Sequence, residues 1–377
     1  MKSVTSNRLF WPSLVLVALL LANFVANHTF FSITVQDGNL FGPIIDILRH
    51  AAPIILVALG MTLVIATRGI DLSVGAVAAI SGSWASMYII GSSDRASVKV
   101  VLTAVGVALL MAIAAGVWNG FLVAVLGIQP IVATLVLMVA GRGLAQVITD
   151  EKILYPDNSP AYKLIGGGYL LAVPFSILIA GGIFALTALL TRKTALGTFI
   201  ESVGVNPEAS RLAGVRARPI IFLVYVFSGL CAGLAGLMLT SNSTSAGPNS
   251  IGLFIELDAI LAVVIGGTSL AGGRFSLAGT LIGAFIIEAM DAFVVIAISA
   301  RSTDVFKACV VILVCLLQSA RVRQWLLNVL RWGNRPTRRD NQPKLPGTPP
   351  AGGTVQTGSA GSPTDAGASD TITARST

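Results

Sequence analysis

Long apolar runs without a charged side chain dominate this sequence and constrain its fold more than any other feature. Residues 9–36 contain no charged side chain, and nine further apolar runs follow. In hydrocarbon every backbone polar group must be satisfied within its own segment, so such runs form transmembrane helices. Only 11% of the 377 residues are charged, whereas soluble domains carry about 25%. A soluble enzyme is therefore excluded, and an all-α membrane protein is predicted.

The few charged residues set the limits of about ten predicted transmembrane helices. The second, eighth and tenth are shorter than the ~20 residues of a straight span. We expect these three to be broken, or to be extended by polar residues at their ends. The predicted spans are residues 51–67, 72–91, 100–126, 131–148, 169–190, 220–241, 259–271, 275–300 and 305–320, with the first span inside residues 9–36.

The positions of Lys and Arg predict the orientation of the chain. Ten spans put both termini on one side, and with a cytoplasmic N-terminus 17 of the 25 basic residues fall inside. Residues 1–320 are expected to form the transmembrane domain. Residues 321–377 are expected to form a basic juxtamembrane segment and a disordered cytoplasmic tail, because 22 of the last 37 residues are Pro, Gly, Ser or Thr. The net charge of +8 is thus a topology signal, and no nucleic-acid partner is expected.

Motifs for catalysis, metal binding or ATP binding are absent from the sequence. It has no G-x-x-x-x-G-K-[ST] loop and no H-E-x-x-H, and it contains only two histidines and three cysteines. We therefore expect a chain that is not an enzyme and holds no metal or cofactor of its own.

Arg142 is the one basic residue expected within the membrane. It lies roughly 17 Å into its predicted helix at ~1.5 Å per residue, and Glu288 and Asp291 lie at similar depths in another. Charges inside a membrane pair with one another or line a cavity. We predict that Arg142 pairs with one of these acids, and the alternative is that it faces water near the outer mouth.

Pairs of small residues at helical spacing predict close helix packing in lipid. The pairs are Gly116–Gly120, Gly229–Gly233, Gly279–Gly283 and Ala78–Gly82.

Two inner connections, residues 67–75 and 271–279, each combine a basic residue with glycines that permit sharp turns. In the first, Arg68 precedes Gly69, and Asp71 follows. Arg68 and Asp71 are expected to pair with each other or to bind helix ends. The alternative is an ordinary tight turn between spans.

The longest inner loop, residues 191–219, contains the signals of a short helix. Asn206 followed by Pro207 is a typical helix start. Glu208 in the first turn and Arg211 near the end match the helix dipole, and Gly214 ends the helix. A capped helix in a basic loop is expected to dock a soluble partner, and the alternative is an ordinary interfacial helix.

Three stretches, residues 58–75, 201–215 and 260–274, resemble bacterial ABC sugar importer permeases, the family of ribose, xylose, arabinose and galactofuranose permeases. The resemblance covers roughly residues 10–320. One departure is Arg68, where the family usually carries a second Gly before Gly69. Residues 36–48, 129–135 and 190–197 look closest to the galactofuranose permeases.

The resemblance implies the fold of an ABC importer permease in the bacterial inner membrane. Such a subunit moves a sugar, galactofuranose or a pentose, from periplasm to cytoplasm by alternating access. Its implied partners are an ABC ATPase subunit that binds the ATP, a periplasmic sugar-binding protein, membrane lipid, and a second permease subunit in a heterodimer or a homodimer.

The resemblance also gives roles to particular residues. Residues 201–215 resemble the loop that engages the ATPase, with Glu208 and Arg211 as contacts and Gly204 and Gly214 as hinges; Glu201 and Asn206 belong to the same loop.

Neutral sugars need hydroxyl or amide partners and aromatic faces. The candidates for the sugar path are Trp118, Asn119 and Gln129, whose alternative roles are interfacial anchoring and loop capping.

Three other functions compete with this interpretation, and one of them is a membrane-embedded enzyme. A secondary transporter without an ATPase needs a buried carboxylate such as Glu288 for its proton site. An amino-acid permease of a related ABC importer differs only in its cargo.

Overall fold

A bundle of helices makes up the part of the chain that the computed structural model describes, which is residues 9–297 with 305, 308, 309 and 312. Two antiparallel hairpins, with pairs Thr34↔Phe41 and Tyr169↔Pro174, accompany the helices. The elements are α1 (Phe10–Ala26), β1 (Thr34–Gln36), β2 (Asn39–Phe41), α2 (Pro43–Ala66), α3 (Val74–Gly91), α4 (Val98–Gly120), the π-helical turn η1 (Phe121–Val125), α5 (Pro130–Thr149), α6 (Pro160–Gly167), β3 (Tyr169–Leu170), β4 (Val173–Pro174), α7 (Phe175–Lys193), α8 (Leu196–Val205), α9 (Pro207–Leu212), α10 (Ala217–Ser243), α11 (Ile255–Ile265) and α12 (Leu277–Ala297).

Seven helices among the described residues are long and apolar enough to cross a membrane. They are α2, α3, α4 with η1, α5, α7, α10 and α12, and they match predicted spans two to seven and nine. The shorter α1, of 17 residues, and α11, of 11 residues, stand where the first and eighth spans were expected. The all-α membrane fold is thus confirmed. The tenth span, both termini and the tail from residue 321 lie outside the described residues, four isolated positions excepted, so the number ten stays a prediction.

Some predicted boundaries were wrong for identifiable reasons. The second span begins at Pro43 and not at residue 51, because its first two turns are the polar extension foreseen for short spans and include Asp46, Arg49 and His50. The sixth begins at Phe175, since residues 169–174 form the β3–β4 hairpin. Charged residues therefore marked the edge of the apolar run rather than the end of the helix.

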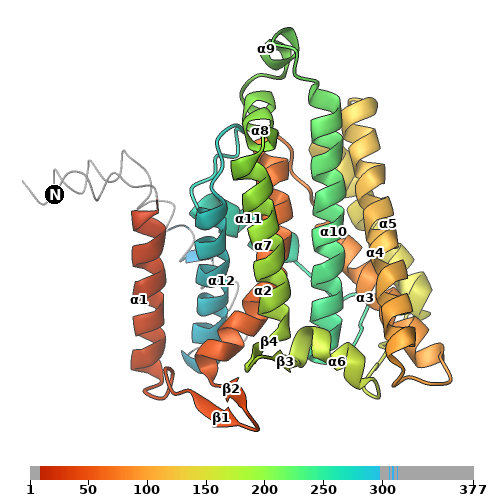
Figure 1. Ribbon diagram of the computed structural model, residues 1–377, viewed down its shortest axis with the longest axis vertical. Helices are drawn as coiled ribbons and strands as arrows, with labels where there is room; N and C mark the ends of the chain where they lie inside the picture. The colour runs from red at the N-terminus through yellow and green to blue at the C-terminus, as the bar shows by residue number, and fades with distance from the viewer. Residues whose placement is uncertain (1–8, 298–304, 306–307, 310–311, 313–377) are drawn as a thin grey trace, which may run out of the picture. The chain divides into compact units, whose positions relative to one another are not determined.

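Helix α2 lies at the centre of the bundle (Figure 1). Every residue from 51 to 67 is buried, as expected for a helix that is apolar on all sides. Helices α7, α10, α11 and α12 pack around it, and α10 also packs against α3 and α4. The buried core therefore follows α2 and its contact with α10.

The small-residue pairs lie at the closest helix contacts, as predicted. Gly116 and Gly120 of α4 face α10, where Gly229 and Gly233 lie against α4. Gly279 and Gly283 of α12 lie against α11, and Ala78 and Gly82 of α3 lie against α10. Hydrogens in place of side chains let these backbones approach closely.

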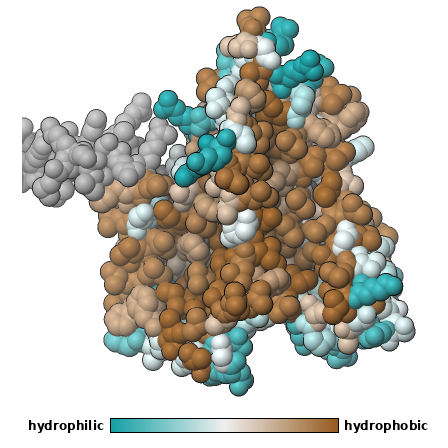
Figure 2. All heavy atoms as spheres, viewed as in Figure 1, coloured by the Kyte–Doolittle hydropathy of each residue, from teal (hydrophilic) through white to brown (hydrophobic). Residues whose placement is uncertain are grey.

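The bundle has two polar ends separated by an apolar belt (Figure 2). We call the end that carries α8 and α9 the α9 end, and the opposite end, with β1–β2, β3–β4 and α6, the hairpin end (Figure 1). Helix α7 reaches the α9 end with Arg192 and Lys193 in its last turn. Large apolar side chains are exposed along the belt, for example Leu110 and Val139, as lipid contact requires.

Gly116 and Gly106, both in α4, provide a matched test of this packing. A β-carbon at Gly116 would lie 2.6 Å from the Tyr225 carbonyl oxygen, whereas one at Gly106 meets nothing within 4 Å. We expect Gly116→Ala to lower the free energy of unfolding by about 1–3 kcal/mol. Gly106→Ala should raise it by about 0.5–1 kcal/mol, because Ala favours helix. Unfolding of the purified chain in detergent measures both values, and changes of the same sign would contradict the packing.

Candidate functional site: the α8–α9 connection

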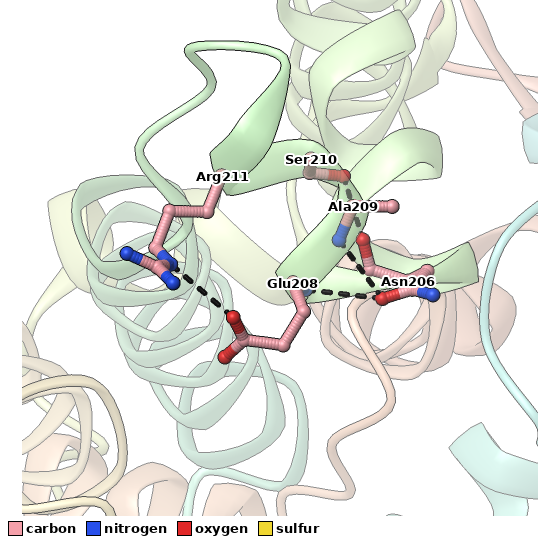
Figure 3. Close-up of polar contacts among 5 residues, drawn as sticks. All are labelled: Asn206, Glu208, Ala209, Ser210 and Arg211. Carbon is pink, nitrogen blue, oxygen red and sulfur yellow. Dashed lines mark hydrogen bonds and ion pairs between the residues drawn. The ribbon is translucent and has the colours of Figure 1, made fainter.

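Helix α9 is a short capped helix at the tip of the α9 end (Figure 3). The Asn206 side-chain oxygen accepts hydrogen bonds from the backbone amides of Glu208, at 3.1 Å, and Ala209, at 3.0 Å. Pro207 occupies the first helical position, where its missing N–H costs nothing. Gly214 follows with φ +86°. The predicted helix, with its start and its stop, is confirmed.

The charged side chains of α9 are exposed and bond only to each other among the described residues. Arg211 Nε lies 3.2 Å from Glu208 Oε2, and both side chains are more than 70% exposed. An exposed pair of this kind contributes little to stability, about 0–1 kcal/mol. These charges are therefore available to a partner at little cost to the fold.

Leu212, the last residue of α9, was not among the predicted site residues. It is 83% exposed at a polar end of the molecule and away from the apolar belt. The signal was present in the sequence, since Leu212 is the one large apolar residue between Pro207 and Gly214. Single exposed leucines are common on protein surfaces, but Leu212 directly follows Arg211 of the exposed ion pair.

Beneath α9, the three sequence stretches that carry the family resemblance meet. Arg68 donates from Nε to the Ala271 carbonyl at 3.2 Å, and from its guanidinium to the Val205 carbonyl. Gly204 lies against the Ala66 carbonyl, and the same carbonyl accepts from the Gly273 amide at 2.9 Å. The last residue of α8 is thus tied to the end of α2 and to the turn before α12.

Arg68 binds the end of α8 through the Val205 carbonyl, and binding to a helix end was one of its two predicted roles; it does not pair with Asp71. Its backbone has φ +65°, a left-handed conformation that favours glycine. This explains why a Gly is usual at this position. A β-carbon at the neighbouring Gly69 would lie 2.5 Å from the Tyr225 hydroxyl oxygen.

Asp71 is 2% exposed and joins three elements inside the bundle. Its carboxylate accepts from the hydroxyls of Ser73, at 2.6 Å, and Ser228, at 2.8 Å. Asn119 donates to Ser73 Oγ at 2.8 Å and to Asp71 Oδ1 at 3.5 Å. The connection between α2 and α3 is therefore bonded to α4 and to α10.

The remaining candidates lie apart from this junction. Trp118 is 52% exposed, Gln129 immediately precedes α5, and Glu201 lies within α8 beside a small surface cavity of about 250 Å3. Of the three residues proposed for sugar contact, only Asn119 is buried.

The predicted pairing of Arg142 with Glu288 or Asp291 was wrong. Its guanidinium donates to the carbonyls of Pro248, Ile251 and Gly252 at 3.1, 2.6 and 3.0 Å. Helix α5 packs against α3, whereas α12 packs against α1, α2 and α11, so equal depth did not bring the charges together. Glu288 Oε1 lies 3.7 Å from His50 Nδ1, and Asp291 lines the same cavity of about 340 Å3.

Comparison with known proteins identifies the relatives of the chain. Residues 43–315 match the family described as branched-chain amino acid transport system / permease component. The galactofuranose transporter permease protein YtfT of Escherichia coli (strain K12) is 50% identical over 328 residues, which is 85% of this chain and 94% of that protein. The fructose import permease protein FruF of Bifidobacterium longum (strain NCC 2705) is 39% identical over 88% of this chain and 93% of that protein. The ribose import permease protein RbsC of Haemophilus influenzae (strain ATCC 51907 / DSM 11121 / KW20 / Rd) is 36% identical over 76% of this chain and 87% of that protein. No solved structure matches the chain.

Removal of the Asn206 cap is expected to fray α9 without unfolding the bundle. Asn206→Ala deletes the acceptor of two amides, which costs about 1 kcal/mol of local stability. In the Ala variant, hydrogen exchange at the backbone amides of Glu208 and Ala209 should therefore be about fivefold faster. In Asn206→Asp, which keeps the acceptor, these amides should exchange at the rate of the unmodified protein. Equal exchange in the Ala and Asp variants would contradict the cap.

The left-handed backbone at Arg68 predicts an order of stability. Arg68→Gly and Arg68→Ala lose the same two donated bonds, but only Ala keeps the strain of φ +65°. The Ala variant should be less stable than the Gly variant by about 1–2 kcal/mol, which melting of the purified protein measures. An Ala variant as stable as the Gly variant would argue against this backbone conformation.

Proposed function

The chain belongs to the branched-chain amino acid transport system / permease component family, and from this membership we propose that it is the transmembrane permease subunit of an ATP-driven importer that moves a sugar into the cytoplasm. One observation carries the proposal beyond the family. Helix α9 presents exposed charges and an exposed leucine at a polar end. The end of α8, which immediately precedes α9, is fixed to the bundle through Arg68 and Gly204. A rigid projection of this kind fits a soluble ATPase.

The proposed cargo is a sugar, with galactofuranose as the first candidate and a pentose as the second. The relatives named above carry galactofuranose, fructose and ribose in their names, and the galactofuranose permease is 50% identical. The family description favours a cargo of another class, a branched-chain amino acid. Uptake of labelled galactofuranose, ribose and leucine by vesicles with the assembled transporter separates these cargoes.

We place the α9 end in the cytoplasm and the hairpin end in the periplasm of a bacterial inner membrane. The excess of basic residues assigned to the inner side supports this orientation. The ATPase subunit, which supplies the ATP site that this chain lacks, would bind at α9. A periplasmic sugar-binding protein would deliver the cargo at the hairpin end, and a second permease subunit, different or identical, would complete the path within the membrane lipid.

The mechanism that we propose transmits ATPase closure from α9 to the buried core. A push on α9 moves α8, since only Asn206 lies between them. Arg68 and Gly204 pass that movement to the connection between α2 and α3. There Asp71 is bonded to Ser73 and Ser228, so the arrangement of α3 against α10 changes. Gly214 absorbs the rotation on the other side of α9, and the bundle alternates between its two openings.

Leu212 and the charged pair of α9 provide the test of this function. Leu212→Asp should weaken binding of the ATPase subunit at least about tenfold, as loss of an apolar anchor does, and ATP-driven sugar uptake should fall with it. Glu208→Lys and Arg211→Glu should lower uptake, because charges at an interface set orientation. Affinity for the purified ATPase subunit and uptake in vesicles measure these effects.

Leu171, between β3 and β4, is the matched control. It is 86% exposed but lies at the hairpin end, so Leu171→Asp should leave ATPase binding unchanged. Normal binding and uptake in all three α9 variants would refute the proposed docking. Uptake driven by a proton gradient without ATP would favour a secondary transporter.

A further inference from the structure

The segment between α10 and α11 crosses part of the membrane without regular secondary structure. Its start lies at the hairpin end, where Ala246 pairs with Leu154 beyond the end of α5. Helix α11 ends at the α9 end, beside the turn that Arg68 binds. Its 11 residues span only ~16 Å, about half of a ~30 Å hydrocarbon layer. Residues 247–254 therefore rise to mid-depth as irregular backbone.

Helix α5 holds this segment through its one charged side chain. Three carbonyls where α-helix is broken accept from Arg142, those of Pro248, Ile251 and Gly252, and the Gly252 carbonyl also accepts from the Ile255 amide at 3.3 Å. Gln146, one turn further along α5, donates to Asn249 Oδ1 at 2.6 Å. These contacts with α5 give the segment a fixed conformation.

A carboxylate at the start of α11 lies near Arg142. Glu256 is only 8% exposed, and a side chain at Gly75 would meet both the Glu256 carboxylate and the Arg142 guanidinium. The two opposite charges therefore flank Gly75 at the first turn of α3. Few buried charges are tolerated in a membrane unless they serve a site.

One face of the segment and of the first turn of α11 is open. Asn249, Ser250, Leu253, Phe254 and Leu257 are exposed, with Phe254 at 57% and Leu257 at 50%. Phe254 also has φ +63°, a strained conformation for a bulky residue. Irregular backbone at membrane depth occurs only where it is buried in protein or lines a water-filled cavity, and never against lipid.

From these observations we propose that residues 249–257 line the sugar path, with Phe254 as the side chain on which the sugar stacks and Asn249 and Ser250 as partners for its hydroxyls. Arg142 and Gln146 are positioning residues for this segment. The assignment rests on the proposed transport of a sugar. It differs from the candidates Trp118 and Gln129, which lie on other elements.

The exposed residues have the chemistry that a neutral sugar requires. A sugar ring has hydroxyls at its rim and an apolar C–H face. Binding sites meet such ligands with an apolar or aromatic surface and a few placed polar groups. The exposed set offers this combination, with one aromatic ring, one amide, one hydroxyl and two leucines.

Cysteine labelling of the assembled transporter tests the location directly. In a chain whose three native cysteines are replaced, Phe254→Cys and Leu257→Cys are compared with Leu110→Cys, which is 64% exposed in the middle of α4. The probe is a charged, membrane-impermeant methanethiosulfonate reagent, which reacts with the thiolate. Cysteines in a water-filled path ionise and should react at least ~10-fold faster than one facing lipid, where the thiolate does not form.

If the cysteines of Phe254→Cys and Leu257→Cys are both labelled as slowly as that of Leu110→Cys, the inference is overturned, whether lipid or a second subunit covers them.

A second variant tests the positioning role. Arg142→Gln removes most of the donors to the three carbonyls, so it should change the labelling rate of Phe254→Cys and leave that of Leu110→Cys unchanged. An unchanged rate at both positions refutes that role. Uptake measured in the same vesicles tests the proposed function separately, because the labelling rates are read whether or not sugar moves.

Discussion

Two arginine side chains bind backbone carbonyls where helices break, and the rest of the structure depends on these contacts. In hydrocarbon a carbonyl without a partner is costly, so a broken helix persists only if another group bonds to it. Arg142 binds three carbonyls before α11, and Arg68 binds those of Val205 and Ala271 at the α9 end. Half-length α11 is possible because Arg142 is present within the bundle, and Arg68 fixes the sharp turn before α12 against α8 at the polar α9 end.

The same contacts connect the surface of the molecule to its core. Helix α9 is joined through α8 to Arg68, and the backbone from Arg68 leads to Asp71 within three residues. Asp71 is bonded to α10 through Ser228 and lies beside Asn119 of α4. In the proposed mechanism a small movement of α9 becomes a rearrangement around α2, because packed interiors shift between discrete arrangements rather than deform gradually.

Sequence patterns predicted the local features well and the long-range pairs poorly. The cap at Asn206, the short α9 and the close contacts of the glycine pairs are confirmed, because each depends on residues near in sequence or on one helix face. The Arg142 partner was wrong, since depth along a helix says nothing about which helices are neighbours. The expected polar extension of the second span is present, but its start at Pro43 was not predicted, because the charged residues Asp46 and Arg49 limit the apolar run and not the helix.

The sequence by itself determined that the chain is a helical membrane protein, where helix α9 begins and ends, and which family it resembles. These conclusions depend on hydropathy, capping and motif spacing, all of which are local. Only the tertiary structure decided that residues 67–75, 201–215 and 271–279 meet, and that Arg142 binds residues 248–252. Such contacts join residues about 60 to 200 positions apart, as the separations of 137 and 203 at Arg68 illustrate, and they are set by the packing of whole helices around α2.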